Sequence, residues 1–322
     1  MLRSQQGGRS EKMSDTKPIR QLGLVMCTAL VVGNMIGSGI FLLPAALAPY
    51  GWNSIFGWIL TIAGGILLAT VFAALSRSFP RAGGPYAFTQ EAFGPAAGFL
   101  VAWSYWISVW VGNAAVATGA VSYLSVFFPS LSTTTGLHAG VTIAIIWLLT
   151  AVNCRGAYLA GGVQLATTVL KLLPLIAVIV LGALVVMGDG GASLAPLDMS
   201  TISIGPITAA ATLTLWGLLG LESATVPAEK VKDPTRTIPR ATMIGMILTG
   251  IIYLLASSAI ILLQPADEIA ASSAPFADFV ARHWGENAGK WLALFAAISG
   301  FGALNGWILV QGELPYAMAR GG

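Results

Sequence analysis

Charged residues are scarce in this sequence. Asp, Glu, Lys and Arg make up 9% of the 322 residues, whereas 56% are hydrophobic and the mean hydropathy is +0.80. Soluble globular domains carry about 25% charged residues, because their surfaces face water. The composition therefore excludes a soluble domain and indicates a membrane protein that crosses the bilayer several times.

Residues that build catalytic or metal centres are equally few. The two cysteines, Cys27 and Cys154, lie in or at the edge of apolar segments, so we expect no disulfide framework. The two histidines fall in expected outer loops, and no H-E-x-x-H or Ser/His/Asp pattern is present. A channel would need a repeated filter or a ring of charges, and the sequence has neither. We therefore expect no enzyme, no metal or other cofactor and no nucleic-acid partner.

Eight apolar segments are long enough to cross a bilayer, which takes about 20 apolar residues. They comprise residues 22–48, 52–75, 95–128, 137–152, 157–187, 206–226, 241–263 and 288–319. The first segment is too long for the apolar region of a signal peptide, so we expect it to be retained. Residues 1–20 form a polar tail before it. Two connections are predicted to carry structure: an amphipathic stretch at 80–95 and a short capping helix within 265–289.

Basic residues are distributed unevenly between the two sides of this topology. Thirteen of the sixteen Lys and Arg residues lie in the N-terminal tail, in alternate loops or after the last span. Only Arg282, Lys290 and the mid-span Lys171 lie elsewhere. Because cytoplasmic loops are enriched in Lys and Arg, we expect the N-terminus to lie in the cytoplasm.

Glycines interrupt two of the apolar segments. Residues 33–44 read GNMIGSGIFLLP, and residues 216–223 read WGLLGLES. Each glycine lowers helix propensity by about 1 kcal/mol relative to alanine, and irregular backbone is tolerated in a membrane only inside protein or along a cavity. Two glycine-interrupted segments in matching positions of two halves indicate the binding site of a transporter. The two segments are five spans apart, which predicts an inverted repeat of five helices whose second copy stops after the eighth span.

Two ionisable residues lie inside apolar spans, where a charge is costly and usually functional. Glu222 lies beside the second break and is a candidate functional carboxylate; alternatively, it only supports the unwound backbone. Lys171 lies within the fifth span. It is either a cation at an ion site or a lysine whose ammonium reaches the cytoplasmic interface.

Several polar and aromatic residues could contact a ligand at the breaks. Ser38 and the amides around Gly39 offer donors at a half-helix terminus, which attracts an anion such as a carboxylate, unless the glycines are only a hinge. Carbonyls freed between Trp216 and Leu219 could accept from an ammonium group. The aromatic residues of the third and eighth spans could bind an organic cation or simply pack.

Taken together, four motifs resemble those of the amino acid–polyamine–organocation transporters. They are residues 33–41 (GNMIGSGIF), 83–86 (GGPY), 216–223 and 232–239 (KDPTRTIP), and the resemblance extends over residues 21–311. Within this superfamily they are most similar to the bacterial arginine/agmatine antiporters. The resemblance implies an all-α, LeuT-like inverted-repeat bundle with broken helices 1 and 6, which is truncated here after about eight helices. Residues 21–322 would form the permease domain, with helices 1–5 as the first repeat and 6–8 as an incomplete second one.

The resemblance also implies a function. The chain would be a secondary transporter of the inner membrane that works by alternating access and exchanges a cationic amino acid for its decarboxylated amine. Relatives can be homodimers. Residue by residue, it implies a carboxylate site at Ser38 and Gly39, a closing aromatic at Trp216, stacking by Trp307, a guanidinium contact at Asn113, an extracellular-side contact at Tyr105, a cytoplasmic-side gate at Tyr86 and a proton-sensitive carboxylate at Glu222.

One residue departs from the arginine/agmatine pattern. Lys171 resembles the helix 5 lysine of proton-coupled and sodium-independent transporters of the same superfamily, in which the amine occupies the sodium position of sodium-coupled relatives. The alternative functions are therefore proton-coupled or sodium-independent transport of neutral amino acids, or an inactive fragment.

Overall fold

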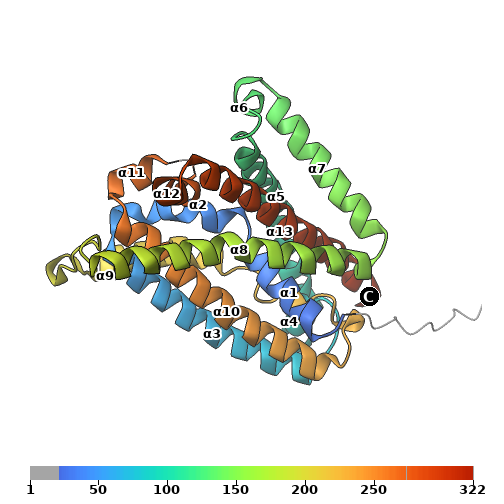
Figure 1. Ribbon diagram of the computed structural model, residues 1–322. Helices are drawn as coiled ribbons and strands as arrows, with labels where there is room; N and C mark the ends of the chain where they lie inside the picture. The colour runs from blue at the N-terminus through green and yellow to red at the C-terminus, as the bar shows by residue number, and fades with distance from the viewer. Residues whose placement is uncertain (1–21, 273, 322) are drawn as a thin grey trace, which may run out of the picture.

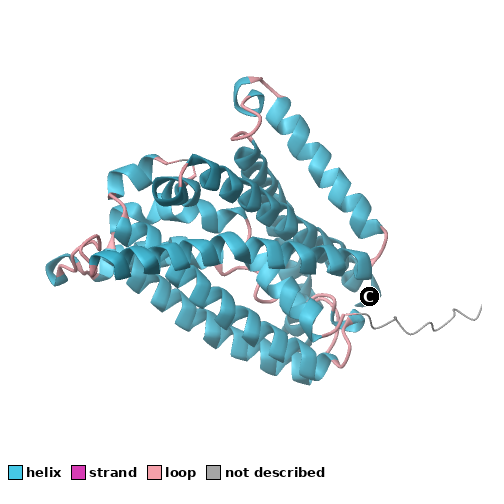
Figure 2. Cartoon of the chain, viewed as in Figure 1, coloured by secondary structure: helices cyan, strands magenta, loops and turns pink. Residues whose placement is uncertain are grey.

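The computed structural model describes residues 22–272 and 274–321, and helices make up most of this part of the chain (Figures 1 and 2). The predicted polar tail, residues 1–20, lies outside the described residues. The long helices are α3 (Trp52–Ser78), α5 (Pro95–Leu124), α7 (Leu137–Cys154), α8 (Ala157–Asp189), α10 (Pro234–Leu263) and α13 (Glu286–Gly321).

The first apolar segment is a discontinuous helix, as the glycines predict. It consists of α1 (Leu24–Met35), α2 (Ser38–Leu47) and the 3-10 turn η1 (Ala48–Tyr50). The described chain has seven helices that are long and apolar enough to cross a membrane, when this discontinuous helix is counted as one. The protein is therefore a multi-pass membrane protein.

The sixth predicted span, residues 206–226, differs from the prediction. Its helix α9 (Ile204–Gly217) is too short to cross a membrane alone. The following residues form turns and the 3-10 segments η3 (Ser223–Thr225) and η4 (Ala228–Lys230), up to the start of α10. Gly220 has a φ of 112°, a conformation that only glycine adopts without strain. The second break is thus longer than predicted, because no α-helix forms between Gly217 and Pro234.

The discontinuous first span lies at the centre of the molecule. In its most apolar 18-residue window 78% of the residues are buried, against 6% for α7, which stands at the edge of the bundle (Figure 1). α1 packs against α8 and α10, and α13 runs along α5 and α8. The discontinuous span is therefore the one most enclosed by protein, as irregular backbone in a membrane requires.

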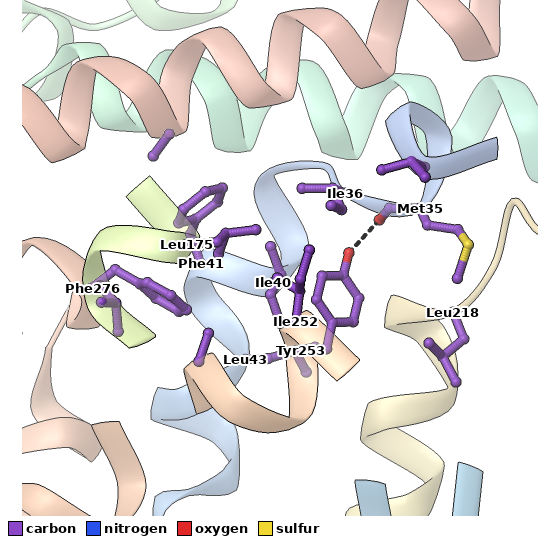
Figure 3. Close-up of a cluster of buried hydrophobic side chains, with 14 of the residues drawn as sticks. Met35, Ile36, Ile40, Phe41, Leu43, Leu175, Leu218, Ile252, Tyr253 and Phe276 are labelled. Atoms are coloured by element: carbon purple, nitrogen blue, oxygen red, sulfur yellow. Dashed lines mark hydrogen bonds between the residues drawn. The ribbon is translucent and has the colours of Figure 1, made fainter. Parts of the chain in front are cut away.

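Short helices occupy the two connections for which structure is predicted. α4 (Pro85–Phe93) precedes α5, and α11 (Ala266–Ala271) and α12 (Pro275–Trp284) connect α10 to α13. α12 covers α2, where the ring of Phe41 meets Phe276 edge-on at 5.0 Å between centroids (Figure 3). The remaining short elements are α6 (Ser130–Thr133) and the 3-10 turn η2 (Met199–Thr201). The expected absence of a disulfide is matched by Cys27 and Cys154, which are both free thiols.

Small residues allow α13 to approach its neighbours closely. A Cβ atom added to Gly300 would lie against the side chain of Ala120 on α5, and one added to Gly302 would overlap Thr167 on α8. Helices in membranes associate through such small residues, because lipid provides no hydrophobic force between them. Gly312, on the same helix, has no atom within 4 Å of an added Cβ.

This packing predicts that two glycines of α13 differ in their tolerance of a larger side chain. Gly300→Leu forces α13 away from α5, and overpacking of this kind costs about 1–3 kcal/mol. Gly312→Leu fills open space and should leave stability unchanged or slightly raised, since leucine favours a helix over glycine. Thermal unfolding of the purified variants in detergent measures both. Equal melting temperatures for the two variants would contradict the packing described for α13.

Candidate functional site

The break between α1 and α2 leaves backbone carbonyls without helical partners, and a lysine binds two of them. Lys171 Nζ donates to the carbonyl of Gly33 at 2.7 Å and to that of Ile36 at 2.6 Å. Its side chain is 0% exposed, and none of the ion pairs in the described chain includes it. The alternative of a lysine reaching the membrane interface is therefore wrong. The ammonium lies in the core, where carbonyl dipoles solvate it.

Side chains from two further helices bind the remaining carbonyls. The Tyr253 hydroxyl of α10 donates to Met35 O at 2.6 Å (Figure 3). Trp307 Nε1 of α13 donates to Asn34 O at 3.0 Å. Together with Lys171 of α8, these side chains satisfy the carbonyls of residues 33–36. The irregular backbone thus has one defined conformation, fixed by three surrounding helices.

The second break is joined to α5 by a carboxylate. Glu222 accepts a hydrogen bond from the Tyr105 hydroxyl at 2.7 Å and another from the backbone N–H of Gly220 at 3.2 Å. The contact with Gly220 agrees with the interpretation that Glu222 supports the unwound backbone. The same carboxylate also borders a cavity, so the two interpretations are compatible.

A cavity of about 210 Å³, here called the central cavity, lies between the two breaks. Residues of α1, α2, α5, α9, the segment after α9, and α13 line it. Six predicted site residues are on its wall: Gly39, Tyr105, Trp216, Leu219, Glu222 and Trp307. Trp216 lies directly against Gly39, so that any Cβ there would overlap the indole ring. This contact explains the need for glycine at position 39.

The cavity wall has two polar ends. The first turn of α2 faces it through Gly37 and Gly39, and no side chain caps this helix terminus. Free backbone N–H groups at a helix N-terminus attract anions. Glu222 is the one Asp or Glu on the wall, and no described Lys or Arg lines it. The cavity is thus suited to a ligand with both an anionic and a cationic group.

Besides Lys171, three predicted residues lie off this wall. Ser38 is buried, and its hydroxyl donates to Val116 O at 3.3 Å. The Asn113 amide is also buried and donates to Gln311 Oε1 of α13 at 2.6 Å. Tyr86 borders a separate cavity at the end of the molecule that carries Arg81 and Arg320. For Ser38 and Asn113 the structure shows contacts between helices, so their direct binding of a ligand stays a prediction.

The central cavity is closed toward this basic end by successive layers. The first is a buried apolar cluster of Val109, Val226 and Val310. The second contains Tyr86, with Leu314 and other small or apolar residues. Tyr105 packs against both layers. It therefore lies toward the basic end of the cavity, and the extracellular-side contact stays a prediction.

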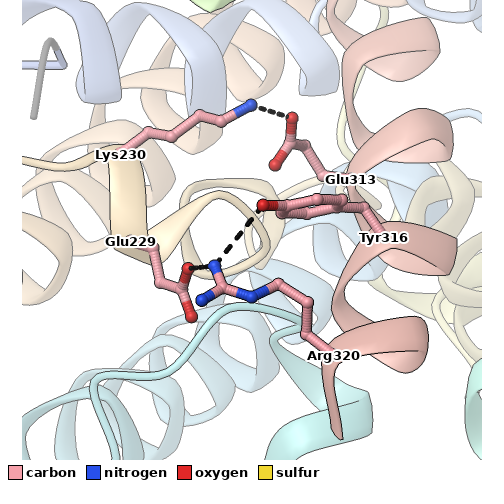
Figure 4. A network of polar contacts seen from close by, with 5 residues as sticks. All are labelled: Glu229, Lys230, Glu313, Tyr316 and Arg320. Carbon is pink, nitrogen blue, oxygen red and sulfur yellow. Dashed lines mark hydrogen bonds and ion pairs between the residues drawn. The ribbon is translucent and has the colours of Figure 1, made fainter. Parts of the chain in front are cut away.

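Ion pairs form the outermost layer (Figure 4). Lys230, in η4, pairs with Glu313 of α13, and the neighbouring Glu229 pairs with Arg320 at 2.7 Å. The backbone of Leu22, before α1, also pairs with this segment, donating to Lys230 O at 3.0 Å. The region that follows the second break is thus tied to both α1 and α13.

Sequence reasoning missed two polar residues of the wall. Asn34 is 3% exposed and its Nδ2 has no hydrogen-bond partner, while its Oδ1 accepts from Gln164 Nε2 at 3.4 Å. Asn34 belongs to the glycine-rich motif, so its position alone could have indicated it. Ser108 of α5 also lines the cavity. Nothing in the sequence distinguishes it from the other serines of this helix.

A substitution of Lys171 tests whether its ammonium stabilises the break between α1 and α2. Lys171→Met keeps an unbranched side chain but removes the ammonium. The buried carbonyl of Gly33 is then left without a donor, and that of Ile36 keeps only the Ser299 hydroxyl at 3.4 Å, which should cost about 2 kcal/mol. Lys290→Met is the matched control, because Lys290 is exposed. Thermal unfolding in detergent should show a large loss for the first variant and little for the second. An unchanged melting temperature for Lys171→Met would contradict the role of the ammonium at the break.

Comparison with known proteins gives consistent matches over nearly the whole chain. The model of the amino acid permease family matches residues 22–322. The cadaverine/lysine antiporter of Escherichia coli (strain K12) is 37% identical over 305 residues, which cover 94% of this chain and 68% of that protein. The putative arginine/ornithine antiporter of Bacillus subtilis is 33% identical over 340 residues, covering 94% and 70%. The putrescine transporter PotE of Haemophilus influenzae is 32% identical over 290 residues, covering 89% and 66%.

Proposed function

This chain belongs to the amino acid permease family, and we propose that it exchanges a cationic amino acid for the amine left when that amino acid loses its carboxylate. Relatives named as cadaverine/lysine and arginine/ornithine antiporters support exchange, and the putrescine transporter supports a diamine as one of the substrates. The chain spans about two thirds of the length of the first of these relatives. We further propose the bacterial inner membrane as its location, with the N-terminus in the cytoplasm.

The observation that carries this proposal is the charge of the central cavity. Glu222 is its one acidic residue, and the described wall has no Lys or Arg to neutralise it. Most residues of the wall are apolar, and a carboxylate in such surroundings attracts a cation more strongly than one in bulk water, because the local dielectric constant is lower. Aromatic faces of Trp216 and Trp307 on the same wall add cation–π attraction. A neutral amino acid has only its α-ammonium to pair with this charge, and that group lies next to the carboxylate, whereas a cationic amino acid or diamine has a second cationic group at a distance from it.

The other end of the cavity explains how two different substrates can share one site. The uncapped N-terminus of α2 can bind the carboxylate of an amino acid. The corresponding amine lacks that carboxylate but keeps the cationic group that Glu222 attracts. Both substrates would then compete for one cavity, and alternating access of a single shared site produces exchange.

Lys171 bears on the question of sodium coupling. Its ammonium already provides a positive charge beside the carbonyls of Gly33 and Ile36. We propose that this fixed charge replaces a bound cation at the break, so that transport does not require sodium. Because Lys171 bonds the backbone and does not line the cavity, it does not by itself favour neutral substrates over cationic ones.

Calorimetry on the purified protein in detergent tests the substrate class. The ligand pairs are lysine with cadaverine and arginine with agmatine, and alanine and leucine are the neutral controls. Binding of one cationic pair without binding of the neutral ligands supports the proposal and identifies the pair. Uptake of labelled ligand into proteoliposomes, stimulated by the unlabelled partner inside, then tests exchange. Binding of alanine or leucine alone would overturn the proposal in favour of neutral amino acid transport.

Glu222→Gln removes the charge of the cavity while keeping its shape. Hydrogen bonds to a charged group contribute about 1.5–3 kcal/mol, so affinity for a cationic ligand should fall about 10-fold or more. If Glu222 is also the proton-sensitive group, the pH dependence of transport should flatten. Glu91→Gln is the control, because Glu91 pairs with Arg81 at the molecular surface. Equal ligand affinity in Glu222→Gln and wild type would refute the role of this carboxylate.

A further inference from the structure

Ser108 has an unusual position among the serines of α5. It lines the central cavity, whereas Ser104 and Ser122 of the same helix and the C-cap residue Ser125 are off the cavity wall. Its hydroxyl donates to the carbonyl of Tyr105, three residues earlier, at 2.7 Å. A serine hydroxyl has one hydrogen to donate and two lone pairs to accept. With the hydrogen engaged by the backbone, Ser108 presents only acceptor lone pairs to the cavity.

Two other polar side chains on the cavity wall, Tyr105 and Glu222, have the same character. The Tyr105 hydroxyl donates its hydrogen to Glu222 at 2.7 Å. The carboxylate of Glu222, when ionised, accepts hydrogen bonds and donates none. The part of the wall formed by Ser108, Tyr105 and Glu222 therefore offers acceptors and has no hydroxyl hydrogen left for a ligand. A carboxylate or a carbonyl of a ligand would be repelled here.

The group that complements such a wall is a primary ammonium. It carries a positive charge and three N–H donors, and it has no lone pair. Glu222 can take one of these donors and Ser108 another. A guanidinium shares this combination, whereas cations without N–H groups lack it, so the wall selects a cation with N–H donors by hydrogen bonding as well as by charge.

The fold determines which ammonium of an amino acid reaches this wall. Ser38, in the first turn of α2, contacts Val116 of α5 through its hydroxyl. Ser108 lies eight residues earlier on α5, about 12 Å along the helix axis. A substrate whose carboxylate lies at the start of α2 thus directs its side chain, and not its α-ammonium, toward Ser108.

We propose that Ser108 is a specificity-determining residue that accepts a hydrogen bond from the distal ammonium of the substrate, beside Glu222. This inference rests on the proposed function, since it assumes a cationic amino acid or diamine in the central cavity. It adds a residue that distinguishes an ammonium with N–H donors from other cations of equal charge.

The test compares Ser108→Ala with Ser125→Ala by calorimetry of lysine and cadaverine binding. Ser125 is the matched control, because its hydroxyl also donates to the carbonyl three residues earlier, at 2.6 Å, and it lies off the cavity wall. Loss of one hydrogen bond should weaken binding about 3- to 10-fold in Ser108→Ala. Ser125→Ala should bind like wild type, and thermal unfolding should show both variants to be folded.

A second ligand separates a lost hydrogen bond from a changed cavity shape. Trimethyllysine carries the same charge as lysine, but its side-chain nitrogen has no N–H. Its affinity should be the same for wild type and Ser108→Ala. If Ser108→Ala lowers the affinity for trimethyllysine as much as the affinity for lysine, the serine acts through the shape of the cavity and the inference fails.

The remaining outcomes are equally decisive. Unchanged lysine affinity in Ser108→Ala, with wild type binding lysine normally, overturns the role of Ser108 and leaves the proposed function intact. Wild-type protein that is folded and binds none of the cationic ligands overturns both. If Ser108→Ala does not fold, Ser108→Cys replaces it, because sulfur is a weak acceptor of similar size and the same loss is expected.

Discussion

The carbonyl groups exposed between α1 and α2 are the constraint on which the rest of the structure depends. A helix that breaks in a membrane needs a donor for each freed carbonyl, since lipid supplies none. Here Lys171, Tyr253 and Trp307 supply the donors, from α8, α10 and α13. The site cannot form until these three helices have packed around the break. The same hydrogen bonds therefore stabilise the fold and define the shape of the central cavity.

The two breaks give the central cavity two different polar ends. The first presents the free N-terminus of α2, and the second places Glu222 beside Tyr105. Between them the cavity has an end that attracts anions and an end that attracts cations. The layers below it, ending in the Lys230–Glu313 pair, close the route toward the basic end in this conformation. Such an arrangement suits a transporter that is open to one side of the membrane at a time.

Local sequence signals predicted much of this architecture. Hydropathy located the spans, and glycine clusters located both breaks, because each depends only on neighbouring residues. The wall residues Trp216, Glu222 and Trp307 followed from the breaks and from the family resemblance. The length of the second break was underestimated, because apolar residues around Leu221 look helical in sequence although Gly220 turns the chain. The inverted repeat and the single permease domain stay predictions.

The sequence by itself thus determined the membrane class, the two breaks and the family, since composition and contiguous motifs carry that information. Only the tertiary structure decided which side chains satisfy the breaks and which face the cavity. The reason is separation along the chain: Lys171 and Gly33 are 138 residues apart, and Trp307 and Asn34 are 273 apart. A second reason is the local orientation of side chains. Ser108 and Ser125 have the same hydrogen bond to the carbonyl three residues earlier, but only the packing of α5 places Ser108 on the cavity wall.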